Sequence, residues 1–232
     1  MTADNLKSDF DIILKGTIVP FFKKHGFKRK AQNFFRQTND IAQCFNVQRS
    51  QWNSYHDDMS FTFNLGFYNQ NIRNISWDKD DKIEFPKTTD CFIQDRLGTY
   101  SHKRDHWYVI KKTISLTQTA QQIQNDLDNF LLPLFEKYKS LNDLATLMNQ
   151  NEKRFGFISP YSDIVYHMVT NQTNKGKALI KEHYKVAQTP QTITDTINFP
   201  DGTKKVKTST FINKHYVAAI KRLADLYEVD LN

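Results

Sequence analysis

The chain has 232 residues, of which 39% are hydrophobic and 13% aromatic, and its formal net charge is +7. This hydrophobic content is sufficient for a folded core and excludes a disordered chain. The seven glycines stand singly, which excludes the Gly-rich loops that present successive backbone amides to a phosphate.

Neither a membrane segment nor a secretion signal is expected. Apolar runs fall short of the ~18 residues needed to cross a bilayer. The first residues lack the basic and apolar segments of a signal peptide. Cys44 and Cys91 are far apart in the sequence and outside any CxxC spacing, so both are expected to be buried, reduced thiols. We therefore expect a soluble, cytoplasmic protein.

Apolar residues recur at helical spacing near the start of the chain, which predicts an amphipathic helix over residues 5–25. Pro20 lies inside this pattern and predicts a kink one turn before the helix ends. Cations in the last turn and Gly26 directly after it are typical of a helix C-terminus. This explains half of the basic stretch 23–36 without any ligand.

A meander of strands follows. Phe34 and Phe35 begin the first strand, and apolar and polar residues alternate over 41–48 in the second. Residues 59–68 show the clearest period-two alternation in the chain, which predicts a strand with one buried face. Two more strands are predicted within 91–98 and 106–112. Together they form an antiparallel sheet with the first helix across one face.

Residues 69–86 are polar and irregular and are expected to form a long surface loop. From residue 117 the apolar period becomes helical, which predicts a long helix kinked at Pro133. Further helices are predicted, with one β-hairpin turning at residues 200–202. The expected fold class is α+β: an antiparallel sheet packed with an N-terminal helix, then a mostly helical C-terminal half. Its two regions, 1–115 and 116–232, are expected to pack as one compact unit.

Two histidines have a spacing that metal sites use. His102 and His106 stand at i and i+4, which would place both imidazoles on one helical face. The residues after them read as a strand, however, so the segment is expected to be a turn. His56, Asp57 and Asp58 could supply further ligands in space. We expect two solvated loop histidines, with no metal, no cofactor and no catalytic constellation.

The basic stretch 23–36 interleaves cations with Phe27, Phe34 and Phe35. Such rings could stack on nucleic-acid bases while the cations neutralise phosphates. Equally, phenylalanines fill a core while lysines and arginines reach outward to water. The second interpretation is preferred.

The ordered pieces GFKRKAQNFFR, FNVQRSQ, FTFNLGF, DRLGTY and HWYVI resemble an uncharacterised bacterial family, domain-of-unknown-function family 4304. The resemblance covers about the first half of the chain, through Ile110. It implies a compact α+β module in a bacterial cytoplasm and assigns no catalytic residue. The matching positions are Gly26, Phe27, Arg29, Asn46, Gln48, Asn64, Gly66, Arg96, Gly98 and Trp107.

Alternation places several of these polar residues on the face opposite Phe45, Phe61 and Phe63. The candidate binding surface consists of Arg29, Asn46, Gln48, Asn64, Arg96 and Trp107.

The leading hypothesis is a non-enzymatic binding module for a protein partner, because no catalytic or phosphate-binding motif is recognised. An immunity-type partner to a toxin is one version, although the basic charge counts against neutralising a basic nuclease. One alternative is a nucleic-acid-binding protein that uses residues 23–36. Another is a small-molecule enzyme with its site on the polar sheet face. A deep pocket holding Arg96, Gln48 and Asn64 together would favour the enzyme.

Overall fold

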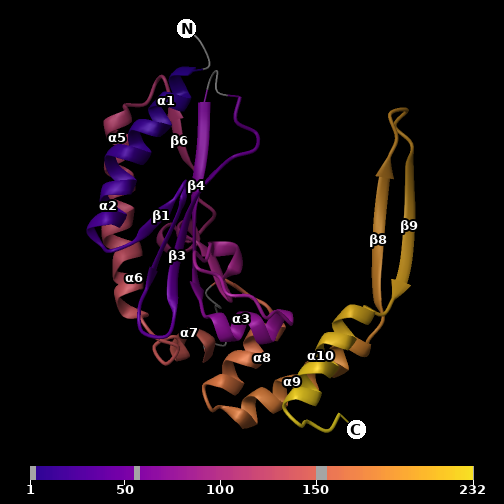
Figure 1. Cartoon of the computed structure of the whole chain (residues 1–232). Helices are drawn as coiled ribbons and strands as arrows, with labels where there is room; N and C mark the ends of the chain where they lie inside the picture. The colour runs from indigo at the N-terminus through magenta and orange to yellow at the C-terminus, as the bar shows by residue number, and fades with distance from the viewer. Residues whose placement is uncertain (1–3, 55–57, 150–155, 232) are drawn as a thin grey trace. The chain divides into compact units, whose positions relative to one another are not determined.

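The computed structural model describes residues 4–54, 58–149 and 156–231 (Figure 1). The chain divides into two compact units, Met1–Ser159 and Pro160–Asn232. Residues 116–137, predicted as part of the second region, belong to the first unit, where Phe135 packs on Phe67 of the sheet. Within the described ranges, no helix is long and apolar enough to cross a membrane.

The first unit is built on a seven-stranded antiparallel sheet, which confirms the α+β prediction. Six strands follow the order β1-β2-β3-β4-β5-β7, and β6 pairs with the other end of β4. The strands are β1 (Lys28–Lys30), β2 (Asn33–Gln37), β3 (Ala42–Arg49), β4 (Asp58–Tyr68), β5 (Ile93–Arg96), β6 (Tyr108–Lys111) and β7 (Phe157–Ile158). The predicted strands are thus present, and β4 lies at the centre of the sheet because it pairs with three others.

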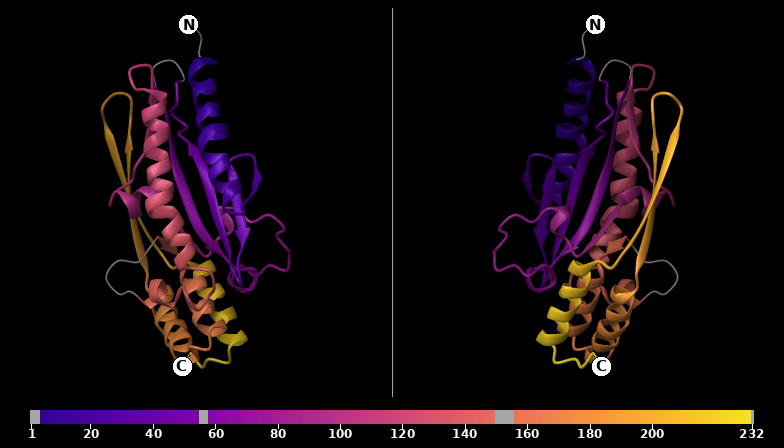
Figure 2. Two further views of the ribbon diagram at one scale, coloured as in Figure 1. Left: turned by 90° about the vertical axis from the view of Figure 1, so that its left-hand side faces the viewer. Right: turned by 90° about the vertical axis from the view of Figure 1, so that its right-hand side faces the viewer.

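Two long helical segments lie side by side across one face of the sheet (Figures 1 and 2). The first comprises α1 (Asp4–Ile13), η1 (Leu14–Ile18) and α2 (Val19–Lys24), and the second α5 (Leu116–Asp126), η3 (Leu127–Leu131) and α6 (Leu132–Lys137). Aromatic rings join helix to sheet, with centroids 5.2 Å apart for Phe10 and Phe61 and 4.5 Å apart for Phe22 and Phe45. The main core therefore lies between the helices and the odd-numbered residues of β4.

Each helical segment contains one π-helical turn just before a proline. η1 precedes Pro20 and η3 precedes Pro133, and each proline lies in the first turn of the following α-helix. Proline has no backbone N–H and cannot make the ordinary i→i−4 hydrogen bond of a helix interior. A π-turn is one way for a helix to accommodate such a break. The irregularity predicted at each proline is thus a π-turn on its N-terminal side.

The first helical segment ends at Gly26, as predicted. Gly26 has a φ of +78°, the left-handed conformation that glycine adopts without steric cost. Its N–H donates to the carbonyl of Lys23, and that of Phe27 donates to the carbonyl of Phe22 over 3.0 Å. These two bonds are the Schellman pattern that satisfies the last carbonyls of a helix.

On the opposite face, a second small core covers one end of the sheet. Its buried residues are Phe35, Ala42, Cys44, Tyr68 and Cys91, with Ile83 and Phe85 packed against them. The predicted loop 69–86 is wrong over its first part, which forms α3 (Gln70–Trp77). The side chain of Asn69 accepts a hydrogen bond from the N–H of Ile72 over 2.9 Å, and Ile72 is fully buried. An N-cap and one anchored apolar residue therefore specify a helix within a polar stretch.

The second unit is helical apart from one hairpin. Its elements are α8 (Pro160–Val169), α9 (Thr173–Gln188), β8 (Gln191–Asn198), β9 (Lys204–Phe211) and α10 (Lys214–Leu226). The start of α8 at Pro160 and the hairpin turn at Gly202, which has a φ of +83°, agree with the prediction. Every residue of β8 and β9 is exposed, so this hairpin is held by its own cross-strand contacts.

Candidate functional site

A row of polar side chains lies on the sheet face opposite the two long helical segments, beyond the end that the second small core covers. Asn33 of β2 lies opposite Asn46 of β3, Asn46 opposite Asn64 of β4, and Asn64 opposite Arg96 of β5. Residues directly opposite each other in neighbouring strands share a face of the sheet. The four side chains therefore form one continuous row across the sheet.

Carboxamide hydrogen bonds fix most of this row. Asn46 Nδ2 donates to Asn33 Oδ1 over 2.9 Å, and Asn64 Nδ2 donates to Asn46 Oδ1 over 3.3 Å. Asn64 Nδ2 also donates to Gln48 Oε1 over 2.8 Å. A carboxamide has two donor hydrogens and an acceptor oxygen, so each retains capacity for a ligand. The row is a pre-ordered hydrogen-bonding surface.

An open groove of about 690 Å³ lies over the β5 end of the row. Its uncharged polar lining comprises Gln48, Asn64, Thr88, Thr89, Gln94 and Thr99. Its charged lining comprises Asp95, Arg96 and Asp105, and Phe157 of β7 adds an aromatic ring that is 68% exposed. The groove thus combines hydrogen-bonding groups with an exposed aromatic ring.

Arg96 is held in the groove from two sides. Its guanidinium pairs with the Asp105 carboxylate, and its Cζ lies 5.2 Å from the centroid of the Trp107 ring. Trp107 Nε1 donates to the same carboxylate over 3.1 Å. Burial acts to raise the pKa of Asp105, but the hydrogen bonds from Arg96 and Trp107 outweigh it, so this pKa is lowered. Asp105 therefore stays ionised and orients Arg96.

The second carboxylate of the groove is shaped by burial. Burial raises the pKa of Asp95, against hydrogen bonds from the N–H groups of Arg96 and Gly156 and from Thr99. Gly156 has a φ of +65°, and a Cβ there would lie 1.9 Å from the carbonyl oxygen of Gln94. Only glycine allows the chain to pass so close to β5, and this approach builds one wall of the groove.

The six candidate surface residues fall into two places. Gln48, Asn64 and Arg96 line the groove, while Asn46 joins it through Asn64 and Trp107 through Arg96. Arg29 lies apart on β1, where its Nε donates to the Ala31 carbonyl over 2.7 Å. Arg29 and Asn46 border a separate hollow of about 430 Å³.

The basic stretch 23–36 is the end of a helix followed by two strands. Phe27, Phe34 and Phe35 are at most 8% exposed, so none of the three rings can stack on a base. The interpretation of these rings as core residues is confirmed. The cations of β1 remain exposed.

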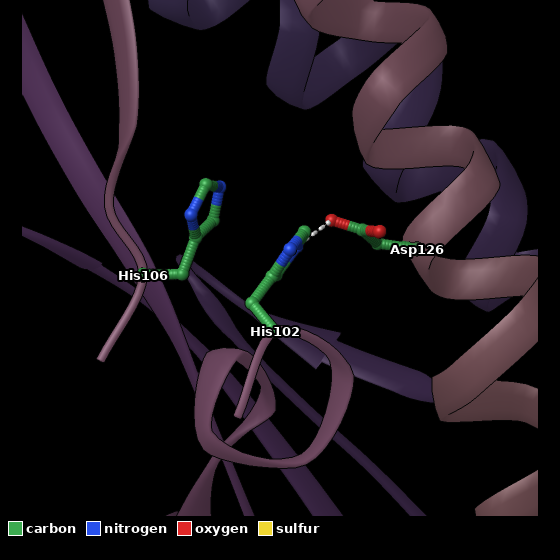
Figure 3. A group of neighbouring side chains, drawn as sticks. All are labelled: His102, His106 and Asp126. Carbon is green, nitrogen blue, oxygen red and sulfur yellow. Dashed lines mark hydrogen bonds and ion pairs between the residues drawn. The ribbon is translucent and has the colours of Figure 1, made fainter. Parts of the chain in front are cut away.

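His102 and His106 lie in a bend before β6, as predicted, but they are not both solvated. Their rings are stacked, with centroids 4.1 Å apart, and both are half-buried. His102 Nε2 lies 2.9 Å from Oδ2 of Asp126, which α5 supplies from the other side (Figure 3). Of the suggested further ligands, His56 and Asp57 lie outside the described residues. Asp58 pairs instead with Lys111, with 3.7 Å between Asp58 Oδ2 and Lys111 Nζ.

Several residues of the groove and of the histidine cluster were not predicted from the sequence. Asp105 could have been recognised as an acidic neighbour of Trp107 in the resembling segment. Asp126, Thr88 and Phe157 carried no local signal, because each reaches its place through the packing of a distant element.

The fold and groove together define an α+β protein with an open groove on one face of its sheet. Residues 18–137 match the protein-family model described as domain of unknown function (DUF4304). The match spans more than half of the 232 residues, and the chain belongs to this family. It covers β1 to β6 and ends with α6, so it includes the polar row. No curated protein and no solved structure matches the chain.

Proposed function

We propose that this protein is a non-enzymatic binding module that holds a segment of a protein partner in the groove on its open sheet face. The observation that carries the proposal is the meeting of Gln48, Asn64 and Arg96 along one open groove of about 690 Å³. Their orientation is fixed before any ligand arrives, which lowers the entropy lost on binding.

The lining suits a peptide segment. Carboxamides and threonine hydroxyls donate and accept hydrogen bonds, as the backbone of an extended peptide does. The exposed ring of Phe157 offers an apolar contact of the kind that anchors interfaces. Arg96, Asp95 and Asp105 are the charged residues that line the groove, so its formal charge is −1 although the chain is basic. We therefore expect a neutral or basic segment in preference to an acidic one.

A small-molecule enzyme on this face is the second candidate, because the groove gathers the three residues that this alternative requires. Sites for small molecules, however, are concave, mostly apolar, and bury most of the ligand. The groove is open and would leave much of a small molecule exposed to solvent, which favours a macromolecular segment. For nucleic acid, burial of Phe27, Phe34 and Phe35 removes the stacking contacts of the basic stretch.

Site-specific photo-crosslinking tests the proposal. A photo-reactive benzophenone amino acid replaces Gln48 in the groove, and in a matched control it replaces exposed Lys79. We expect a discrete protein adduct from position 48 in the cells that make this protein, and none of the same mass from position 79. Adding Arg96→Ala to the position-48 variant should abolish the adduct. Identical adducts at both positions, or adducts indifferent to Arg96→Ala, would contradict binding in the groove.

A further inference from the structure

We propose that His102, His106 and Asp126 form a binding site for a divalent transition-metal ion, with Zn²⁺ as the ion the donor set suits best. Each residue offers one ligand atom, and the three atoms lie within 4.8 Å of one another. His102 and Asp126 are already at 2.9 Å, and His106 stacks on His102 (Figure 3). None of the three ligands lines the groove, although Asp105 of the groove directly precedes His106 in the chain.

Three separate elements bring these ligands together. His102 follows α4 (Leu97–Ser101), where its N–H donates to the carbonyl of Gly98 over 2.8 Å. His106 precedes β6, and its carbonyl accepts from Thr62 Oγ1 of β4 over 2.8 Å. Asp126 is the last residue of α5, directly before the π-turn η3. The sheet, a short helix and a long helix therefore each fix one ligand.

Gly98 permits the close approach of the two histidines. A Cβ at this position would lie 2.5 Å from Cβ of His106 and 2.6 Å from its backbone nitrogen. Contacts that short do not occur, so any other residue would push α4, and His102 with it, away from His106. The backbone at this point is fitted to keep the two imidazoles together.

The donor set matches the chemistry of zinc. Two imidazoles and one carboxylate are the ligands of open zinc sites, which keep a fourth position for water. Tetrahedral zinc, with bonds of about 2.0–2.2 Å, holds its ligand atoms roughly 3.3–3.5 Å apart. The ligand atoms of His102 and Asp126, at 2.9 Å, are slightly closer than that and would separate by a few tenths of an ångström, while His106 would approach and rotate its ring. The side chain of His102 is 28% exposed, which gives an ion access from solvent.

Neighbouring side chains support the ligands. Tyr108 donates its hydroxyl to Oδ2 of Asp126 over 2.5 Å, and Gln122 Nε2 lies 3.3 Å from Nε2 of His106. Such outer contacts orient metal ligands. Asp126 is 5% exposed, and a buried carboxylate requires a compensating positive charge. An ion pair with His102 would supply that charge by itself, whereas a metal ion would use the stacked imidazole of His106 as well.

Metal titration tests this site. The full chain is stripped with a chelator, dialysed, and titrated with Zn²⁺ in competition with a chromophoric chelator. We expect one Zn²⁺ per chain. The double variant His102→Ala/His106→Ala should bind Zn²⁺ more weakly by about tenfold or more. Loss of a residue that only hydrogen-bonds to a metal ligand already lowers metal affinity by roughly 10–100-fold. The control His215→Ala removes an exposed histidine of α10 and should leave the affinity unchanged.

A second measurement does not depend on the folding of a variant. In the wild-type chain, Zn²⁺ should shift the imidazole NMR resonances of two of the seven histidines, those of His102 and His106. Less than one Zn²⁺ per chain, an equal loss of affinity in His215→Ala, or shifts confined to other histidines would each overturn the proposal.

Discussion

The guanidinium of Arg96 lies over the indole ring of Trp107, and both side chains bind the carboxylate of Asp105. Arg96 ends β5 and Trp107 precedes β6, two strands that pair with different stretches of the same edge of β4. The cluster of Arg96, Asp105 and Trp107 therefore lies between the end of β5 and the start of β6, the two strands that share this edge of β4. It holds Arg96 at the groove without embedding it in the core.

Arg96→Ala should change binding far more than stability. The side chain of Arg96 is 34% exposed, and a partly exposed ion pair and cation–π contact each contribute about 1 kcal/mol or less. We expect the free energy of unfolding to fall by roughly 1 kcal/mol in a denaturant titration, with Arg104→Ala as an exposed neighbouring control. A loss of several kcal/mol would show that Arg96 supports the fold and is not reserved for a ligand.

Phe63→Ala should destabilise the protein by roughly 3–5 kcal/mol, because it removes a large side chain from a packed core. Phe63 is fully buried in β4, and its ring centroid lies 4.7 Å from that of Tyr108 and 5.0 Å from that of Phe45. Chemical denaturation measures the effect. Phe157→Ala is the matched control and should have little effect, since its ring is mostly exposed. Equal losses would contradict the central position of Phe63.

Replacing Lys28, Arg29 and Lys30 together by alanine should leave the fold intact, because exposed charges contribute well under ~1 kcal/mol each. We expect no measurable affinity for a mixed-sequence oligonucleotide near physiological salt, before or after the change. Fluorescence anisotropy over a salt series measures it. Micromolar binding that the triple variant loses, with a salt slope lower by about one unit per phosphate contact, would restore the nucleic-acid alternative.

The thiols of Cys44 and Cys91 should not react with a thiol reagent while the protein is folded. Cys44 is fully buried and Cys91 is 5% exposed. Burial, and then a hydrogen bond with Cys44, raises the pKa of Cys91, so its reactive thiolate is scarce. Absorbance with Ellman's reagent should report both thiols only after addition of guanidinium chloride. Rapid reaction of either thiol in buffer would mean that the second small core opens readily.

Tyr68 should make the folded protein less stable at high pH. Burial raises its pKa from 10.0 to about 12, and its hydroxyl donates to Gln70 Oε1 over 2.6 Å. The pKa of Tyr68 is higher in the folded chain than in the unfolded chain. The contribution of Tyr68 to the free energy of unfolding is therefore complete below pH 10 and is lost as the pH rises through about 12. The linked loss amounts to roughly 2–3 kcal/mol. Denaturation of wild type and Tyr68→Phe between pH 9 and 12 should show a steeper decline for the wild type, and parallel curves would refute it.

The sequence by itself determined the elements whose signal is local. Alternation over 59–68 specified a strand with a buried face, and Gly26 and Pro160 marked the end and the start of helices. These features follow from side-chain period and from the backbone freedom of single residues. The alternation also indicated that Asn46, Gln48 and Asn64 share the polar face, since the period of a strand fixes which side each residue takes.

Only the tertiary structure decided which distant residues meet. Cys44 and Cys91 join one small core, Asp126 reaches His102 from a helix, and Phe157 borders a groove with Gln48. Each meeting depends on strand register and on how a helix lies across the sheet, and both are set by the burial of many side chains at once. A residue whose role depends on a single long-range contact leaves no periodic pattern in the local sequence. The groove and the histidine cluster could therefore be recognised only in the tertiary structure.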